Sequence, residues 1–347
     1  MLALMSGRRR RGKQEAVPRA LREVGASELP PVVLVTGASS GLGLAIARAL
    51  LRRRYRLILT ARESSLHRFA RHGIFPSERV WLRALDVTRA ADRKAVVAEA
   101  NARWGGVDVL VNNAGISLRA VVEHVSEADR SLQMDVNFIA PLELSRLVLP
   151  SMRKKQGGRI LNISSVGGMM AMPTMSTYSA SKFALEGASE ALWYEARPFG
   201  IYVTLVQPGF INSDSFRNVK YTTPSKASYD TVHSAYHWHY HFMEGFIGRV
   251  ARRVFATPES VAAKVVRTIE LKHPPLRLPA TLDATLFSLL RRVLPRSAYH
   301  WFLYRSLPGI RTWGPAATNI ARDPPAADVT TPTDEADTDV AFEIGNS

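Results

Sequence analysis

Three residues near the middle of the chain have the types and spacing of a proton-transfer site: Ser165, Tyr178 and Lys182. Tyr178 and Lys182 are four positions apart, so on a helix they lie on one face. An ammonium group beside a phenol favours the phenolate and lowers the Tyr pKa from about 10, which makes Tyr a usable general acid or base. Ser165 follows an apolar run, and its hydroxyl could hold a substrate carbonyl or hydroxyl. A Tyr-x-x-x-Lys spacing alone is common, and it gains specificity here because it follows a strand-like run and a glycine-rich segment.

A glycine-rich segment earlier in the chain has the form of a phosphate-binding turn. It lies between an apolar run at 32–36 and a helix-like stretch at 42–54. Glycines let the backbone approach a pyrophosphate, and the start of a helix presents free N–H groups. The spacing is GxxxGxG rather than GxGxxG, and a tight turn without a ligand is the alternative. The candidate cofactor-binding residues here are Thr36, Gly37, Ser39, Ser40, Gly41, Leu42 and Gly43.

Arg62 follows the second apolar run, nineteen residues after Gly43. A carboxylate at this point would hold the ribose 2′-hydroxyl of NAD, whereas an arginine suits the 2′-phosphate of NADP. Neither Thr60 nor Ala61 is acidic, which favours NADP, although a solvated surface arginine is the alternative in so Arg-rich a chain. Further candidates stand after the next two strand-like runs: Asp86, Val87, Asn113, Ala114 and Gly115.

The elements that must position these residues alternate between strand-like and helix-like stretches. Continuous apolar runs predict strands at 32–36, 55–60, 79–85, 107–112, 158–163 and 201–207. Helical spacing predicts helices at about 42–54, 89–103, 126–153, 177–197 and 258–272. This alternation predicts an α/β fold whose parallel sheet has helices on both faces. Ligands bind at the carboxyl ends of strands in such sheets, where the candidate residues stand.

Composition and charge limit the classes of protein to which this chain can belong. The chain has 347 residues, 46% hydrophobic and 22% charged, which is typical of a globular protein and excludes collagen, a coiled coil and wholesale disorder. It has no cysteine, which excludes disulfides and thiol catalysis. The net charge is +16, with a basic segment at 1–30 expected to be a flexible arm and an acidic tail at 312–347 expected to be disordered. We expect no nucleic-acid binding, because no recognised motif accompanies the charge.

Taken together, the motifs Thr36–Gly43, Asn112–Gly115, Ser165, Tyr178–Lys182 and Pro208–Gly209 resemble those of the short-chain dehydrogenase/reductases. The resemblance is close over residues 32–213 and looser over 214–295. It implies a single Rossmann-like, doubly wound domain of about seven parallel strands and NAD(P)(H)-dependent oxidoreduction. It assigns the acid–base role to Tyr178, orientation of the reacting oxygen to Ser165, and ribose binding and tuning of Tyr to Lys182.

The same resemblance adds four positions. Asn137 falls where the family has an asparagine that supports a water-linked proton relay, and a locally bonded helix asparagine is the alternative. Pro208 and Gly209 resemble the turn on the nicotinamide side of the cofactor, and Ser213 stands where many members have threonine. The segments around Ser165 and Tyr178 look closest to the 17-beta-hydroxysteroid and retinol dehydrogenase branch, which implies a lipophilic alcohol or carbonyl substrate. Family members are commonly dimers or tetramers, and we expect the same here.

Two later segments concern the substrate. A lid at about 212–255, within a catalytic domain of residues 31–280, holds the run Tyr236–Met243, whose aromatic residues suit an apolar pocket wall. No carboxylate accompanies its histidines, so we expect no metal. The extension at 281–311 predicts a basic amphipathic helix, which either packs on protein or lies on a membrane surface.

No apolar run is long enough to span a membrane, and the first five residues are too short for a signal segment. We therefore expect a cytoplasmic protein, with peripheral membrane association as an alternative. The leading interpretation is an enzyme that uses NADP(H), preferring NADPH, to interconvert a lipophilic alcohol and its ketone or aldehyde. The other is a non-catalytic nucleotide sensor on the same fold, against which the intact Ser, Tyr and Lys set argues.

Overall fold

The computed structural model of the 347-residue chain describes residues 29–212 and 219–314. The basic arm, apart from 29–30, lies outside this part of the chain, as do Ser213 and the acidic tail from residue 315. The main sheet consists of β1 (Val32–Val35), β2 (Arg56–Ala61), β3 (Val80–Ala84), β4 (Val109–Asn112), β6 (Gly158–Ile163), β7 (Ile201–Gln207) and β9 (Arg277–Pro279). A separate pair consists of β5 (Leu118–Arg119) and β8 (Lys220–Tyr221).

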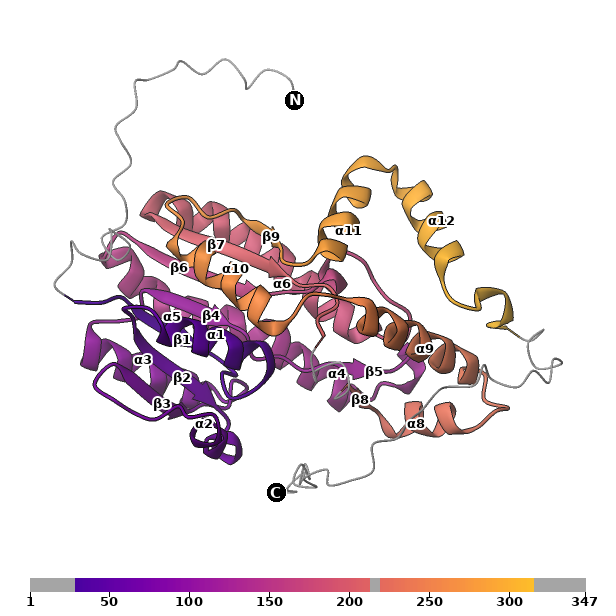
Figure 1. The fold of residues 1–347 in the computed structure, drawn as a ribbon, viewed down its shortest axis with the longest axis horizontal. Coiled ribbons are helices and arrows are strands. Elements are labelled where there is room, and N and C mark those ends of the chain that lie inside the picture. Colours follow the sequence, from indigo (N-terminus) through magenta and orange to yellow (C-terminus); the bar gives the residue numbers. More distant parts are fainter. Residues whose placement is uncertain (1–28, 213–218, 315–347) are drawn as a thin grey trace, which may run out of the picture.

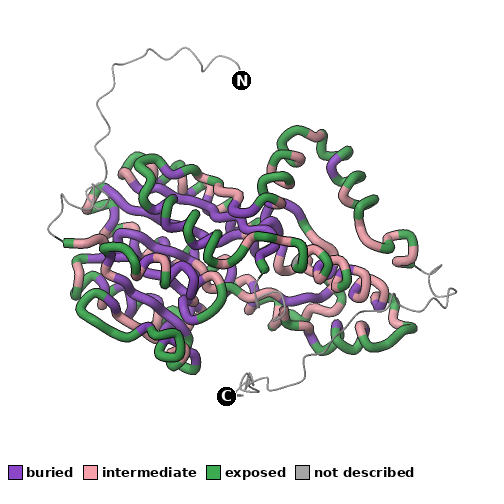
Figure 2. The backbone as a smooth tube through the Cα atoms, viewed as in Figure 1, coloured by how far each residue is buried: buried purple, intermediate pink, exposed green. Residues whose placement is uncertain are grey.

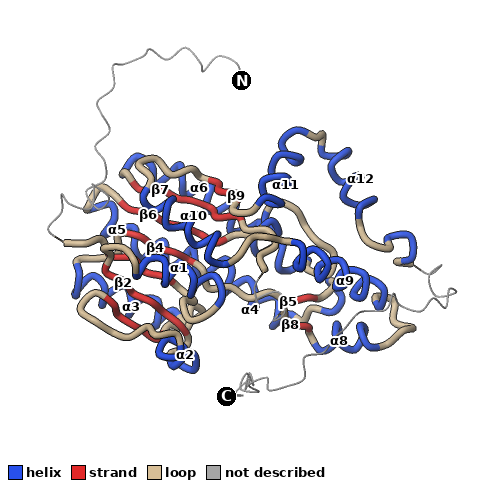
Figure 3. The backbone as a smooth tube through the Cα atoms, viewed as in Figure 1, coloured by secondary structure: helices blue, strands red, loops and turns tan. Residues whose placement is uncertain are grey.

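The helices lie between these strands and after them. They are α1 (Gly41–Leu51), α2 (His67–Arg71), α3 (Ala90–Trp104), α4 (Glu127–Met134), α5 (Ala140–Lys154), α6 (Ser176–Ala196), α8 (Thr223–Asp230), α9 (His237–Arg253), α10 (Pro258–Glu270), α11 (Leu282–Val293) and α12 (Arg296–Ser306). Figure 3 shows the strands of the main sheet lying together between helices, with β5 and β8 apart from them.

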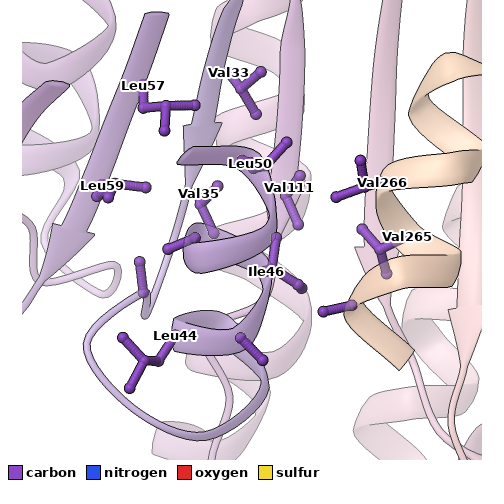
Figure 4. Packing of buried hydrophobic residues seen from close by; sticks show 14 of the residues in the cluster. Val33, Val35, Leu44, Ile46, Leu50, Leu57, Leu59, Val111, Val265 and Val266 are labelled. Carbon is purple, nitrogen blue, oxygen red and sulfur yellow. The ribbon is translucent and has the colours of Figure 1, made fainter. Parts of the chain in front are cut away.

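The expected α/β fold is confirmed: the main sheet has seven strands, all its pairings are parallel, and their order is β3-β2-β1-β4-β6-β7-β9. Successive side chains of a strand point to opposite faces. Val33 and Val35 of β1 join the core cluster with α1 and α10, while Val32 and Leu34 join the cluster with α3, α5 and α6. Figure 4 shows the first of these clusters, where α1 and α10 cover the sheet. Because both faces are covered, the central strands β1, β4, β6 and β7 are buried along their length (Figure 2).

The helix predicted over 126–153 is interrupted. α4 ends at Met134, a π-helical turn runs over Asp135–Ile139, and α5 begins at Ala140. A π turn inserts one extra residue and rotates the side chains that follow, and such turns frequently occur at functional sites. The apolar periodicity continues across the turn, so the sequence pattern alone does not reveal it.

Candidate active site

The carboxyl ends of the strands in the main sheet border a cavity of about 650 Å³. The cavity extends from Arg62, after β2, to Ile247 on α9. Most sequence-predicted site residues line it, as expected for the carboxyl edge of a parallel sheet. These residues are Gly37, Ser39, Ser40, Gly41, Leu42, Gly43, Arg62, Asp86, Val87, Asn113, Ala114, Gly115, Ser165, Tyr178, Lys182, Pro208 and Gly209.

The glycine-rich turn is held tightly enough that its glycines are required. Gly37 and Gly41 have φ values of 62° and 52°, a conformation that favours glycine. A Cβ added at Gly43 would lie 2.1 Å from the Gly37 carbonyl oxygen and 2.5 Å from Asn113 Nδ2. Asn113 Nδ2 itself donates to the carbonyls of Thr36 and Gly37. The turn leads directly into the first turn of α1, whose residues Gly41, Leu42 and Gly43 line the cavity, and the free N–H groups of a helix N-terminus suit a pyrophosphate.

Thr36 and Asn137 do not line the cavity; they hold residues that do. Thr36 Oγ1 accepts hydrogen bonds from the backbone N–H groups of Asn113 and Ala114, each at 3.0 Å. Asn137, fully buried in the π turn, accepts from Ile116 N at 2.9 Å and donates to Ile116 O and Ser181 Oγ. Its side chain thus ties the loop after β4 to α6, and its Oδ1 borders Gly115, which Lys182 Nζ also borders.

Ser165, Tyr178 and Lys182 converge at the centre of the cavity. Ser165 is the second residue after β6, and its Oγ accepts from Gly167 N at 3.0 Å. The Tyr178 ring packs on Gly167, where an added Cβ would lie 2.9 Å from Tyr178 Cε1. Lys182, one turn further along α6, donates from Nζ to the Ile163 carbonyl at 2.9 Å and lies 5.9 Å from the Tyr178 ring centroid. One hydroxyl, one phenol and one ammonium group therefore lie together.

The electrostatics of these groups differ from the expectation drawn from sequence. Burial raises the pKa of Tyr178, and the hydrogen bond with Ser165 offsets part of that rise. Burial lowers the pKa of Lys182 to about 8, against which Glu186 acts. The expected lowering of the Tyr178 pKa by Lys182 is therefore not found. The ammonium donates to a backbone carbonyl rather than to the phenol, and loss of water around the phenol has the larger effect.

The cavity also has lining residues that no sequence motif indicates. Ser65 and Arg68 lie beside Arg62 at one end of the cavity, and Thr88 lies beside Asp86. At the other end the wall contains Met172, Met175, Phe210, Ile211 and Ile247. A short polar helix such as α2 and isolated apolar residues in loops have no periodic signal, so only the folded chain reveals them.

The Pro208–Gly209 turn depends on the C-terminal extension. Thr281 Oγ1 accepts from Gly209 N at 2.9 Å, and Asp283 Oδ2 accepts from Phe210 N at 2.8 Å. Both acceptors belong to the N-terminal end of α11, and Thr281 also caps that helix. The first turn of α11 is therefore part of the site's support.

Comparison with known proteins identifies this arrangement. The short chain dehydrogenase family matches residues 31–223, more than half of the chain. The chain belongs to the short-chain dehydrogenase/reductase family. This short-chain dehydrogenase/reductase is an oxidoreductase, and it is 34% identical to a 3-ketodihydrosphingosine reductase of Bacteroides thetaiotaomicron, over 79% of this chain and 97% of the relative. It is 32% identical to retinol dehydrogenase 8 of Bos taurus, over 79% and 89%.

Two solved structures extend the comparison. A short-chain dehydrogenase from Streptomyces avermitilis has a TM-score of 0.64 and 32% identity, with 80% of this chain and 98% of that chain covered. A metagenomic short-chain oxidoreductase in complex with NADP has a TM-score of 0.54 and 25% identity, covering 72% and 96%. Both agree with the seven-stranded parallel sheet and place the oxidoreductase within a family whose structures include NADP complexes.

The described part of the segment predicted as a lid, residues 212–255, contains β8, α8 and α9. Its histidines pack against aromatic rings: His241 stacks on Tyr229 at 4.0 Å between centroids, and His239 lies 4.5 Å from Trp313. Among residues 29–212 and 219–314, no group of three or more His, Asp or Glu side chains is placed to hold a metal. In the same ranges, no helix has the length and apolar character needed to cross a bilayer.

Proposed function

We propose that this chain is an NADPH-dependent reductase of lipophilic ketones or aldehydes, and that it catalyses the reverse oxidation of the corresponding alcohols. One observation carries the proposal: Ser165, Tyr178 and Lys182 meet in a cavity with arginines at one end and an apolar wall at the other. The names of the sphingoid and retinol relatives and the NADP complex of a structural neighbour support it.

Ser165, Tyr178 and Lys182 have separate roles in carbonyl reduction. Ser165 Oγ donates a hydrogen bond to the carbonyl oxygen and orients it. Tyr178 transfers its phenolic proton to the same oxygen, which becomes the hydroxyl of the alcohol. Lys182, cationic below its pKa of about 8, stabilises the phenolate that remains. The glycine turn and Asn113–Gly115 would hold NADPH, with the Pro208–Gly209 turn on its nicotinamide side, and its reduced nicotinamide would supply the hydride to the carbonyl carbon.

The first experiment measures cofactor binding and turnover with the purified protein. We expect NADPH to quench tryptophan fluorescence at lower concentration than NADH, and NADPH to be oxidised in the presence of at least one steroid, retinoid or fatty-chain ketone. Binding without turnover across that panel would favour the non-catalytic sensor. Failure of folded protein to bind either nucleotide would contradict the proposal.

We also propose that the α11–α12 extension, residues 282–306, docks on the surface of an anionic membrane. Leu282, Leu286, Leu289 and Val293 recur at helical spacing, and each is between 54% and 85% exposed. Trp301, Phe302 and Tyr304 of α12 are exposed as well. Figure 1 shows both helices extending away from the sheet. Residues 282–314 contain five arginines and one acidic residue, a charge that complements anionic headgroups and opposes pairing with a second copy.

Vesicle flotation tests this docking surface. The Leu286→Glu/Leu289→Glu variant is expected to lose flotation with phosphatidylcholine–phosphatidylglycerol vesicles, because it places two charges on the apolar face. Phe75→Glu, which changes a 63% exposed residue between α2 and β3, is the matched control and is expected to float like the wild type. Unchanged flotation of the double variant would contradict the proposal. Conversion of a dimer to a monomer without a change in flotation would assign the face to a second copy instead.

A further inference from the structure

Arg119 is a buried cation in the cavity wall that neither the proton transfer nor the predicted cofactor contacts use. It is the second residue of β5 and is 4% exposed. Arg119 pairs with Tyr221 of β8, and the next residue, Ala120, forms a β-bridge with Met175. Arg119 therefore lies between the lid and the segment that leads into α6 and Tyr178. It lines the same cavity as the catalytic trio.

The Arg119 guanidinium has few partners for its five N–H donors. Nη1 donates to Tyr221 Oη at 3.3 Å, and the guanidinium carbon lies 5.7 Å from the centroid of that ring. Nε makes no hydrogen bond, and no carboxylate in the described part of the chain forms an ion pair with Arg119. Burial and the nearby Glu244 raise the pKa values of Tyr221 and Tyr229, and Arg119 opposes that rise at Tyr221.

Arg93 and Arg159, which are also buried, leave Nε without a partner too, but their terminal nitrogens donate to backbone carbonyls, whereas Arg119 donates to a tyrosine hydroxyl in a wall that, Lys220 apart, is largely apolar at this end. A buried charge is costly unless it is paired and hydrogen-bonded, and most buried guanidinium donors in proteins have acceptors. The planar guanidinium matches the two oxygens of a carboxylate or phosphate. Met172, Met175, Phe210 and Ile247 line the same end of the cavity and suit a hydrocarbon chain. The available donors and this wall fit a molecule that is both lipophilic and anionic.

We propose that Arg119 binds an oxyanion, a carboxylate or a phosphate, carried by the substrate away from its reacting carbonyl. The substrate class is then a lipophilic oxo acid or oxoalkyl phosphate rather than a neutral or cationic lipid. The identity of the reacting group rests on the proposed function, whereas the anion site does not. Arg119 acts as a specificity-determining residue and takes no part in the transfer of hydride or proton.

Turnover of four substrates that share one chain length and differ only in head group tests the proposal. The probes are a long-chain oxo acid, its methyl ester, the oxoalkyl phosphate and the oxoalkyl amine. We expect kcat/KM of the wild type to be at least about tenfold higher for the preferred anion than for the ester, and lowest for the amine. Comparison of kcat/KM for the oxo acid and the oxoalkyl phosphate shows whether the site prefers a carboxylate or a phosphate. Equal kcat/KM for all four probes would overturn the proposal.

The Arg119→Met variant removes the charge while keeping side-chain volume. We expect it to lose the preference for anions through a higher KM, with kcat for the methyl ester unchanged. Arg119→Lys, which keeps the charge without the planar fork, is expected to be intermediate. Arg130→Met, at an exposed position on α4, is the matched control and should behave as the wild type. Equal losses for acid and ester in Arg119→Met would assign the residue a structural role and overturn the proposal.

Direct measurement of ligand binding tests the anion site independently of the proposed function. Calorimetry with saturated fatty acids, alkyl phosphates and methyl esters, with and without NADPH, needs no turnover. Tighter binding of the anions to wild type than to Arg119→Met supports the anion site even if no ketone is reduced. No difference between the two proteins would overturn it. Thermal unfolding checks the fold: Arg119→Met should unfold at the same or a higher temperature, because an apolar side chain replaces an incompletely bonded buried charge.

Discussion

Replacing Tyr178 with Phe is expected to lower kcat for ketone reduction by about 10³-fold or more while leaving the NADPH dissociation constant unchanged. The substitution deletes the phenolic O–H, which is the proton donor to the substrate oxygen. It keeps the ring that packs on Gly167, so the geometry around Ser165 should survive. Stopped-flow or steady-state NADPH oxidation gives kcat, and fluorescence titration gives nucleotide affinity on the same samples.

A control on the same helix makes this result specific. Tyr194→Phe removes a hydroxyl from a residue that is 61% exposed on α6, and it should leave both kcat and NADPH affinity unchanged. Tyr178→Phe with kcat near the wild-type value would remove Tyr178 from the acid–base role and direct attention to Ser165 or to a bound water as proton donor.

Replacing Arg62 with Asp is expected to lower kcat/KM for NADPH by about 10²-fold and to raise the relative use of NADH. Arg62 is exposed directly after β2, and Arg68 and Ser65 line the same end of the cavity. The change replaces attraction for the 2′-phosphate by repulsion, and an aspartate can accept hydrogen bonds from the ribose hydroxyls of NADH. Steady-state kinetics with both nucleotides, at one fixed substrate concentration, measures the preference.

Arg54→Asp makes the same change of charge at an exposed residue just before β2, at the amino edge of the sheet. It should leave the NADPH/NADH ratio unaltered, which separates a local contact from a general effect of net charge. An unchanged ratio in Arg62→Asp would reject Arg62 as the residue that reads the phosphate. In that case Arg68 would be the next residue to replace.

Most of the fold could be predicted because its strands are continuous apolar runs. The six predicted strands are all present in the main sheet, since strands covered on both faces need mostly apolar side chains, and buried polar ones such as Arg159 and Asn162 of β6 are hydrogen-bonded. The seventh strand, β9, reads Arg-Leu-Pro and has no such run. It is a strand because three residues pair with β7, a tertiary contact that no local pattern encodes. β5 and β8, two residues each, were missed for the same reason.

In the candidate site, too, some residues could be predicted from the sequence and others could not. Residues at strand ends could be predicted because the sheet topology brings those ends to one edge. Arg119 could not be predicted, because nothing in the sequence distinguishes this buried arginine from the rest of the 46 basic residues. Its burial arises from pairing with Tyr221, 102 residues later in the chain. The pKa of Tyr178 was also predicted wrongly, because sequence spacing gives the neighbour of a group but not its loss of water.

The packing of α1 against α10 has a consequence for biosynthesis. About 200 residues separate Leu51 from Pro258, yet Val265 and Val266 of α10 complete the cluster around Ile46 and Leu50 of α1. At ribosomal rates of 5–20 residues per second, that gap corresponds to roughly 10–40 s of elongation. Throughout that interval the nascent chain exposes the apolar face of β1 and α1 that Figure 4 shows covered in the finished protein. Expression yield should therefore depend on chaperones that bind emerging chains, and a chain truncated before α10 should aggregate.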